Sequence, residues 1–155
     1  MSVVVTESAA EAEALGAELA PRLGPGDVVL VSGELGSGKT TVIRGACRAL
    51  GIAEPVLSPT FTIGRRYAGD PPVSHLDLYR LADLELEDPA LLDDYLTADA
   101  ITFIEWPALA AHASLAEGVA IARSVELRHL GGDRREISIG PPPTGRRAAG
   151  YVSGV

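Results

Sequence analysis

The sequence is poor in cysteine and lysine, with a single residue of each type among 155. Since Cys47 stands alone, the chain cannot form an intramolecular disulfide or a metal site built from several thiolates, and it fits a reducing compartment. The one lysine is Lys39, so the other twelve basic residues are arginines. The guanine-specific motif Asn-Lys-x-Asp therefore has no lysine to supply it, which disfavours an ordinary GTPase.

Long apolar runs are missing as well. Charge or glycine interrupts each apolar stretch well before the roughly 20 residues that a membrane-spanning helix needs. Near the amino terminus, Glu7, Glu11 and Glu13 stand where a secretory signal would carry basic and then apolar residues. We therefore expect a cytoplasmic protein that makes no contact with a membrane.

Positive charge is the third scarcity. The 13 basic and 21 acidic residues give a formal net charge of −8, which repels phosphate backbones and disfavours autonomous binding to nucleic acid. The length and the 46% hydrophobic content match one ordinary domain. We place that domain at residues 1–140 and expect a flexible tail, rich in proline, glycine and arginine, at residues 141–155.

The periodicity of apolar residues predicts an α/β fold. Residues 28–31 are wholly apolar, which is typical of a parallel strand covered on both faces, whereas residues 121–130 and 135–139 alternate and predict an exposed antiparallel pair. The remaining expected elements are strands at 3–5, 61–67, 73–78 and 100–104, helices at 9–20, 40–50 and 107–115, and one or two short helices within 81–96.

The segment from Gly33 to Thr40 reads Gly-Glu-Leu-Gly-Ser-Gly-Lys-Thr and matches the Walker A pattern between a strand and a helix. Its glycines let backbone N–H groups turn inward around phosphates, and the helix start adds a positive dipole end. Lys39 would reach the terminal phosphates, and the Thr40 hydroxyl would bind magnesium. The sequence therefore predicts Mg-ATP binding by a P-loop NTPase with a three-layer fold, a mixed parallel and antiparallel central sheet flanked by helices.

Two carboxylates follow strand-like runs and are candidates for a Walker B acid. Asp77 comes at the end of one run, and Glu105 directly follows the apolar strand at 100–104, so that it would emerge at the carboxyl end of the sheet. Either one could hold magnesium or position the attacking water. The alternative for each is a solvated acid at a strand end.

Further polar residues carry functional hypotheses with plain alternatives. Ser58 and Thr60 lie where nucleotide-sensing switch loops occur, and the alternative is a simple turn. His75 is a candidate proton shuttle or a packed histidine. Trp106 would cap the site or a partner surface, or else serve as a buried anchor.

The turn before the last expected strand carries Arg134 and Arg135. A guanidinium there could stack on adenine or pair with phosphate, and the alternative is that both are solvated. The acidic surface of residues 81–96 would meet a basic partner or face solvent.

Taken together, the motifs at 33–41, 58–61 (Ser-Pro-Thr-Phe), 75–80 (His-Leu-Asp-Leu-Tyr-Arg) and 104–106 (Ile-Glu-Trp) resemble the TsaE (YjeE) family over residues 6–139. The resemblance implies the ATPase subunit of the bacterial machinery that makes threonylcarbamoyladenosine at position 37 of tRNA. It implies two protein partners, a transferase subunit and its paralogous scaffold. ATP hydrolysis would reset the complex, and this subunit would contact tRNA only indirectly.

The resemblance also assigns roles to residues. Thr40, Glu105 and Asp77 would organise magnesium, with Lys39, Asp77 and Glu105 as the catalytic set, and Thr60 would belong to a nucleotide-responsive loop. The residues expected to contact ATP are Thr6, Glu34, Leu35, Gly36, Ser37, Gly38, Lys39, Thr40, Thr41 and Arg134. A small P-loop metabolite kinase and an adaptor that hydrolyses little remain as alternatives.

Overall fold

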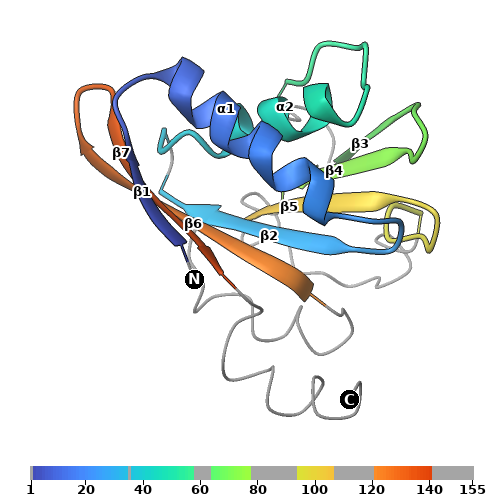
Figure 1. Ribbon diagram of the computed structural model, residues 1–155. Coiled ribbons are helices and arrows are strands. Elements are labelled where there is room, and N and C mark those ends of the chain that lie inside the picture. The colour runs from blue at the N-terminus through green and yellow to red at the C-terminus, as the bar shows by residue number, and fades with distance from the viewer. Residues whose placement is uncertain (1, 35, 58–63, 78–93, 107–120, 141–155) are drawn as a thin grey trace.

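The computed structural model describes residues 2–34, 36–57, 64–77, 94–106 and 121–140. In this part of the chain, seven strands form one sheet in the order β1-β7-β6-β2-β5-β4-β3 (Figure 1). The strands are β1 (Ser2–Thr6), β2 (Val28–Gly33), β3 (Gly64–Tyr67), β4 (Val73–Asp77), β5 (Ile101–Trp106), β6 (Ile121–Gly131) and β7 (Arg134–Gly140). The helices are α1 (Ala9–Leu19) and α2 (Lys39–Ala49), with a short 3-10 turn, η1 (Ala20–Arg22).

The sheet has a parallel centre and antiparallel edges. Strand β2 pairs in parallel with β5 and β6, and β4 pairs in parallel with β5. Strand β3 pairs antiparallel with β4, while β7 pairs antiparallel with β6 and β1. The prediction of an α/β fold with a mixed sheet is confirmed.

The expected second helical layer falls mostly outside the described residues. Helix 107–115 lies wholly outside them, and of the stretch 81–96 only residues 94–96 are described, where the chain forms a turn and bend. The expected tail at 141–155 and the first half of the strand expected at 61–67 also lie outside. The described helices α1 and α2 cover one face of the sheet (Figure 1).

One expectation about the last two strands was confirmed. The alternating residues of β6 and β7 predicted an exposed antiparallel pair, and the two strands do pair antiparallel, with exposed or half-buried residues along each. The strand order adds that β2 lies on the other side of β6. The alternation is real, since buried Val125 and Leu127 are two residues apart. Alternation records how a strand's faces are covered and carries no information about which strands lie beside it.

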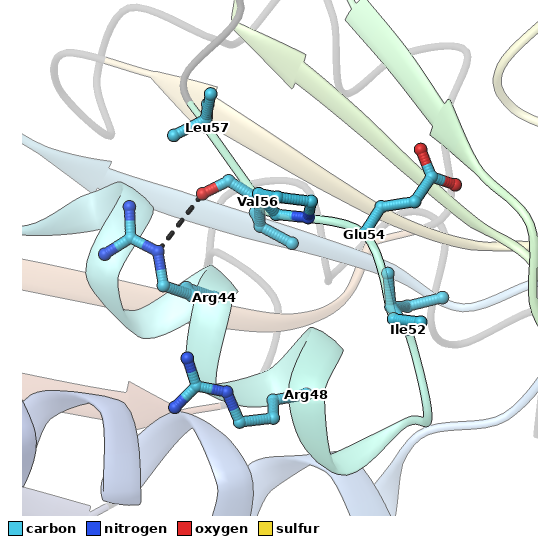
Figure 2. A pocket seen from close by; sticks show the side chains of 8 residues that line it. Arg44, Arg48, Ile52, Glu54, Val56 and Leu57 are labelled. Carbon is cyan, nitrogen blue, oxygen red and sulfur yellow. Dashed lines mark hydrogen bonds between the residues drawn. The ribbon is translucent and has the colours of Figure 1, made fainter.

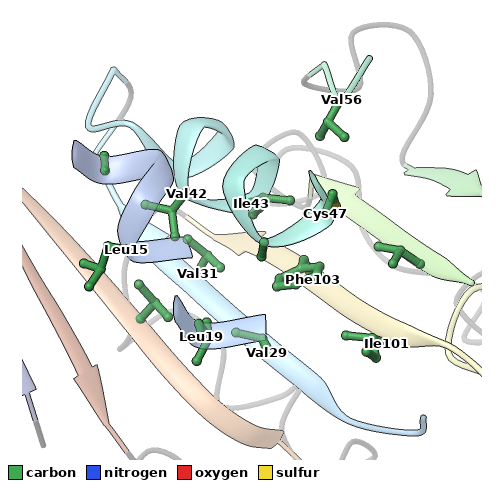
Figure 3. Close-up of a cluster of buried hydrophobic side chains, with 14 of the residues drawn as sticks. Leu15, Leu19, Val29, Val31, Val42, Ile43, Cys47, Val56, Ile101 and Phe103 are labelled. Carbon is green, nitrogen blue, oxygen red and sulfur yellow. The ribbon is translucent and has the colours of Figure 1, made fainter. Parts of the chain in front are cut away.

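The core fills the space between the sheet and the two helices. Side chains of β2 and β5, among them Val31 and Phe103, pack against Val42 and Ile43 of α2 and Leu15 of α1 (Figure 3). Strand β2 is buried along its whole length, as its apolar run predicts. The first residues of α2 are thereby fixed directly beside the end of β2.

Two glycines bring α1 and α2 unusually close. A Cβ on Gly16 would lie 2.0 Å from the Val42 carbonyl oxygen, and one on Gly45 would lie 1.9 Å from the Glu13 carbonyl oxygen. Ser8 caps the start of α1, and its hydroxyl accepts a hydrogen bond from the Glu11 N–H at 3.2 Å.

No helix in the described part of the chain is long and apolar enough to cross a membrane.

Candidate functional site

The loop between β2 and α2 has the backbone shape that its glycines permit. Gly36 and Gly38 have φ angles of 79° and 99°, in the left-handed region that side chains with a Cβ rarely adopt. The Ser37 N–H donates to the Glu34 carbonyl at 3.1 Å and closes a turn. Gly38 then caps α2, so the positive end of the helix dipole lies at the loop.

Lys39 turns back into this loop. Its ammonium donates to the carbonyl oxygens of Gly33 at 2.7 Å and Glu34 at 2.9 Å, and the residue is 7% exposed. Burial lowers the pKa of Lys39, while the nearby carboxylates of Glu105, Asp77 and Glu34 raise it in opposition. A phosphate group would offer the buried ammonium a stronger anionic partner than the two carbonyls do.

Thr40 and Glu105 meet across the site. The Thr40 hydroxyl lies 3.2 Å from each carboxylate oxygen of Glu105, and Glu105 is 3% exposed. Pairing of Val31 with Glu105 places this carboxylate beside the end of β2. The sequence placed Glu105 just beyond its strand, but β5 continues through Trp106, because pairing with β2 extends the strand past its apolar run.

His75 lies behind Glu105. Its Nε2 is 2.5 Å from a Glu105 carboxylate oxygen, the ring is fully buried, and Nδ1 has no hydrogen-bond partner. A buried unpartnered N–H is costly, so we assign the hydrogen to Nε2, which donates to the carboxylate. His75 is thus a packed histidine that holds Glu105, and a proton-shuttle role stays a prediction.

Asp77 ends β4 directly opposite Glu105 in the register of β4 and β5. Its influence on the pKa of Lys39 places its carboxylate within electrostatic reach of the loop. Over the described residues no group of three or more His, Cys, Asp and Glu side chains is arranged to hold a metal ion. The hydroxyl of Thr40 and the carboxylates of Glu105 and Asp77 are nonetheless the oxygen donors that Mg²⁺ uses when phosphates and water complete its shell.

The start of β7 meets the other side of the loop. Arg135 donates from Nε to the Ser37 carbonyl at 3.0 Å and from Nη2 to the Gly36 carbonyl at 3.3 Å. The resemblance predicts that Arg134 contacts the nucleotide. Its side chain is 54% exposed, and its Nε lies 3.4 Å from the Glu7 carboxylate. Its role in nucleotide binding stays a prediction.

The residues alone did not distinguish the two arginines, and the resemblance favoured Arg134. A signal for Arg135 was present in the strand pattern. Ile137 belongs to the core under the helices, and residues two apart in a strand face the same side, so Arg135 faces the glycine-rich loop after β2.

A small hollow adjoins this region. Its volume is about 70 Å³, and it is lined by Ser8, Ala9, Ala12, Gly38, Thr41, Asp133 and Arg135. Thr6, paired in register with Arg135, is 2% exposed, and its hydroxyl has no hydrogen-bond partner. The structure therefore brings Thr41 and the neighbourhood of Thr6 to one side of the loop.

A larger hollow lies elsewhere on α2. It has a volume of about 410 Å³ and lies between α2 and residues 52–57, and the Arg44 Nε donates to the Val56 carbonyl at its edge (Figure 2). None of the predicted site residues lines it. Chemistry, and not size, therefore selects the loop after β2 as the candidate site.

Several predicted residues cannot be placed in this way. Leu35, Ser58 and Thr60 lie outside the described residues. Trp106 is the last residue of β5, paired in register with Ser32. The structure brings together Lys39, Thr40, Glu105, Asp77 and His75 from the two strands β4 and β5 and the start of α2.

Comparison with known proteins gives a consistent result. The family model "Threonylcarbamoyl adenosine biosynthesis protein TsaE" matches residues 6–137. A protein of Mycobacterium leprae named tRNA threonylcarbamoyladenosine biosynthesis protein TsaE is 39% identical over 136 residues, covering 82% of this chain and 78% of that protein. One of the same name from Bacillus subtilis is 40% identical, covering 74% of this chain and 69% of that protein.

A solved structure agrees as well. The crystal structure of YdiB from Bacillus subtilis superposes with a TM-score of 0.71 and 28% sequence identity. The alignment covers 95% of this chain and 89% of that one.

Proposed function

The chain belongs to the TsaE family, which takes part in tRNA threonylcarbamoyladenosine biosynthesis, and from this we propose that it is the subunit that binds and hydrolyses ATP. The observation that carries the proposal is the placement of Lys39. A buried ammonium donates to two carbonyls of a glycine-rich loop at a helix start, with Thr40 and Glu105 in contact beside it.

Each residue has a role in this account. Lys39 and the backbone N–H groups of the loop would hold the phosphates, as the loop geometry and the helix dipole favour. The hydroxyl of Thr40 and the carboxylates of Glu105 and Asp77 would hold Mg²⁺, which neutralises charge on the phosphates when bound. His75 would keep the Glu105 carboxylate in place, and one of the two carboxylates would orient the attacking water.

Hydrolysis would then reset a complex rather than transfer the carbamoyl group. The proposed partners are a transferase subunit and its paralogous scaffold. These partners would bind the tRNA that is modified at position 37, so this chain would contact tRNA only indirectly. The net charge of −8 supports this division, since a protein of this charge gains little from direct contact with RNA. The cytoplasmic location stays a prediction.

Phosphate release with Mg-ATP tests the proposal, measured first with the chain alone and then with the two partner proteins. We expect slow release alone and faster release with both partners. Phosphate transfer to a small metabolite without free phosphate would favour the kinase alternative instead. Tight ATP binding with no release of phosphate under any condition would favour the alternative of an adaptor that hydrolyses little.

A further inference from the structure

We propose that Arg135 is a positioning residue that fastens the phosphate loop from the side of β7 and thereby sets the affinity for the triphosphate. The proposal rests on the proposed ATP-binding function. It assigns a role to a residue that makes no contact with Lys39, Thr40 or Glu105 in the hydrogen bonds described above.

The contacts of Arg135 form a bridge. Two of its hydrogen bonds go to the loop, to the carbonyls of Ser37 and Gly36. Two others go to its own turn, from Nη1 to the Gly132 carbonyl at 2.8 Å and to the Arg134 carbonyl at 2.9 Å. The guanidinium therefore connects the loop after β2 to the β6–β7 turn, although Arg135 and Ser37 are 98 residues apart in sequence.

Because the loop carbonyls accept hydrogen bonds from Arg135, the orientation of two peptide units is fixed. In a planar trans peptide the C=O and the following N–H point in opposite directions. When the Gly36 carbonyl points to Arg135, the Ser37 N–H points away and closes the turn on Glu34. When the Ser37 carbonyl points to Arg135, the Gly38 N–H also points away from it, and that N–H belongs to the set that a phosphate loop presents to its ligand.

Glycine makes this fastening necessary. Gly36 and Gly38 have left-handed φ angles. Because glycine lacks a Cβ, many other backbone conformations are also accessible to these two residues. A loop that samples them binds more weakly, because only a fraction of the molecules present the correct donors. Arg135 selects one conformation before the ligand arrives.

Charge acts in the same direction. The Arg135 guanidinium donates to the carbonyls of Gly36 and Ser37, so a cation takes up the negative ends of two of the loop's peptide dipoles. What the loop then offers a ligand, beside the Lys39 ammonium, is its N–H groups. Both effects favour an anion, and both act on binding rather than on the bond-breaking step.

The chain supplies a matched control on the neighbouring strand. Arg128 of β6 has the same charge, but its side chain is 68% exposed and lies 3.5 Å from the Glu136 carboxylate. Replacing Arg128 or Arg135 with glutamine changes the net charge equally. Of the two changes, only the one at Arg135 removes hydrogen bonds to the loop.

The experiment measures Mg-ATP affinity by calorimetric titration, together with KM and kcat for phosphate release, in Arg135→Gln, Arg135→Lys and Arg128→Gln. We expect Arg135→Gln to raise Kd and KM about tenfold, the effect of losing charged hydrogen bonds, with kcat within about twofold of the parent. Arg135→Lys should recover part of the loss, since it restores the charge but not the forked geometry. Arg128→Gln should bind within about twofold of the parent.

Equal affinity in Arg135→Gln and Arg128→Gln would overturn the proposal. So would a fall in kcat with unchanged KM, or a loss of affinity that tracks a lowered melting temperature in both Arg135 variants. These failures differ from failure of the proposed function, in which the unaltered chain itself would not bind Mg-ATP.

Discussion

At the scale of single residues, the site is notable for charged groups that are buried. Lys39 and Glu105 are 7% and 3% exposed, and burying a charge is costly unless it is paired and hydrogen-bonded. The structure partners each of them, Lys39 with loop carbonyls and Glu105 with Thr40 and His75. Such an arrangement is hard to explain by packing alone and fits a site that receives a charged ligand.

The first prediction concerns Glu105. Glu105→Ala should retain ATP binding, since Lys39 and the loop are untouched, but should lower kcat by about a hundredfold or more through loss of a metal or water contact. Binding and phosphate release are measured side by side. Glu136→Ala, which removes a half-buried carboxylate that lies 3.5 Å from the Arg128 guanidinium and outside the candidate site, serves as the control. Normal turnover without Glu105 would move the catalytic role to Asp77.

The second prediction concerns the thiol of Cys47. Burial raises its pKa to about 12 from an ordinary value of 9.0, and the residue is fully buried in α2. At pH 8 the native protein should therefore react with iodoacetamide about a thousandfold more slowly than the urea-unfolded chain. Rapid labelling of the native protein would contradict the packing of α2 against the sheet.

The same shift affects stability at high pH. Because folding raises the pKa, the neutral thiol favours the folded state, and this contribution is complete below about pH 9 and is lost as the pH rises towards 12. Over that window the protein should lose up to about 1.4 kcal/mol of unfolding free energy per pH unit relative to Cys47→Ala. Denaturant titrations of both proteins at pH 8 and pH 10 measure the difference.

At the scale of elements, the sequence predicted most of what local pattern controls. The buried run of β2, the start of α2 and the glycine-rich loop between them were all predicted correctly, because each is defined by neighbouring residues. The positions at which strands end were predicted less accurately. Glu105 lies within β5 and not after it, since pairing with a neighbour, which no local pattern contains, decides where a strand stops.

The third prediction concerns the contact between α1 and α2. Gly45→Ala would place a Cβ 1.9 Å from the Glu13 carbonyl oxygen, so the helices must separate, and we expect a loss of about 1–3 kcal/mol in unfolding free energy. Gly24→Ala is the control, because a Cβ there meets nothing within 4 Å. It should change stability by about 0.5 kcal/mol or less. Equal effects at both positions would show that the helices do not pack as closely as described.

At the scale of the whole molecule, the site is a product of strand order. The strand order β6-β2-β5-β4 puts the ends of β2, β5 and β4 side by side and so gathers Lys39, Glu105 and Asp77. Sequence reasoning named these residues but not their contacts, because strand order and register depend on pairing between distant segments. The contact of Thr40 with Glu105, the support from His75 and the bridge from Arg135 all come from that pairing.

The fold also implies that a ligand should stabilise the entire domain. The loop joins the central strand to the helix that covers the core, so a ligand held there binds the folded state and not the unfolded chain. Mg-ATP at about one hundred times its Kd would then add about 2.7 kcal/mol to the free energy of unfolding.

The most direct test of the account is a calorimetric titration of Mg-ATP into the unaltered protein and into Lys39→Ala, with circular dichroism as a check that both are folded. The account predicts saturable binding to the first protein and an affinity weaker by about a hundredfold in the second, with the fold retained. Equal affinity in the two folded proteins would contradict the assignment of the loop as the nucleotide site.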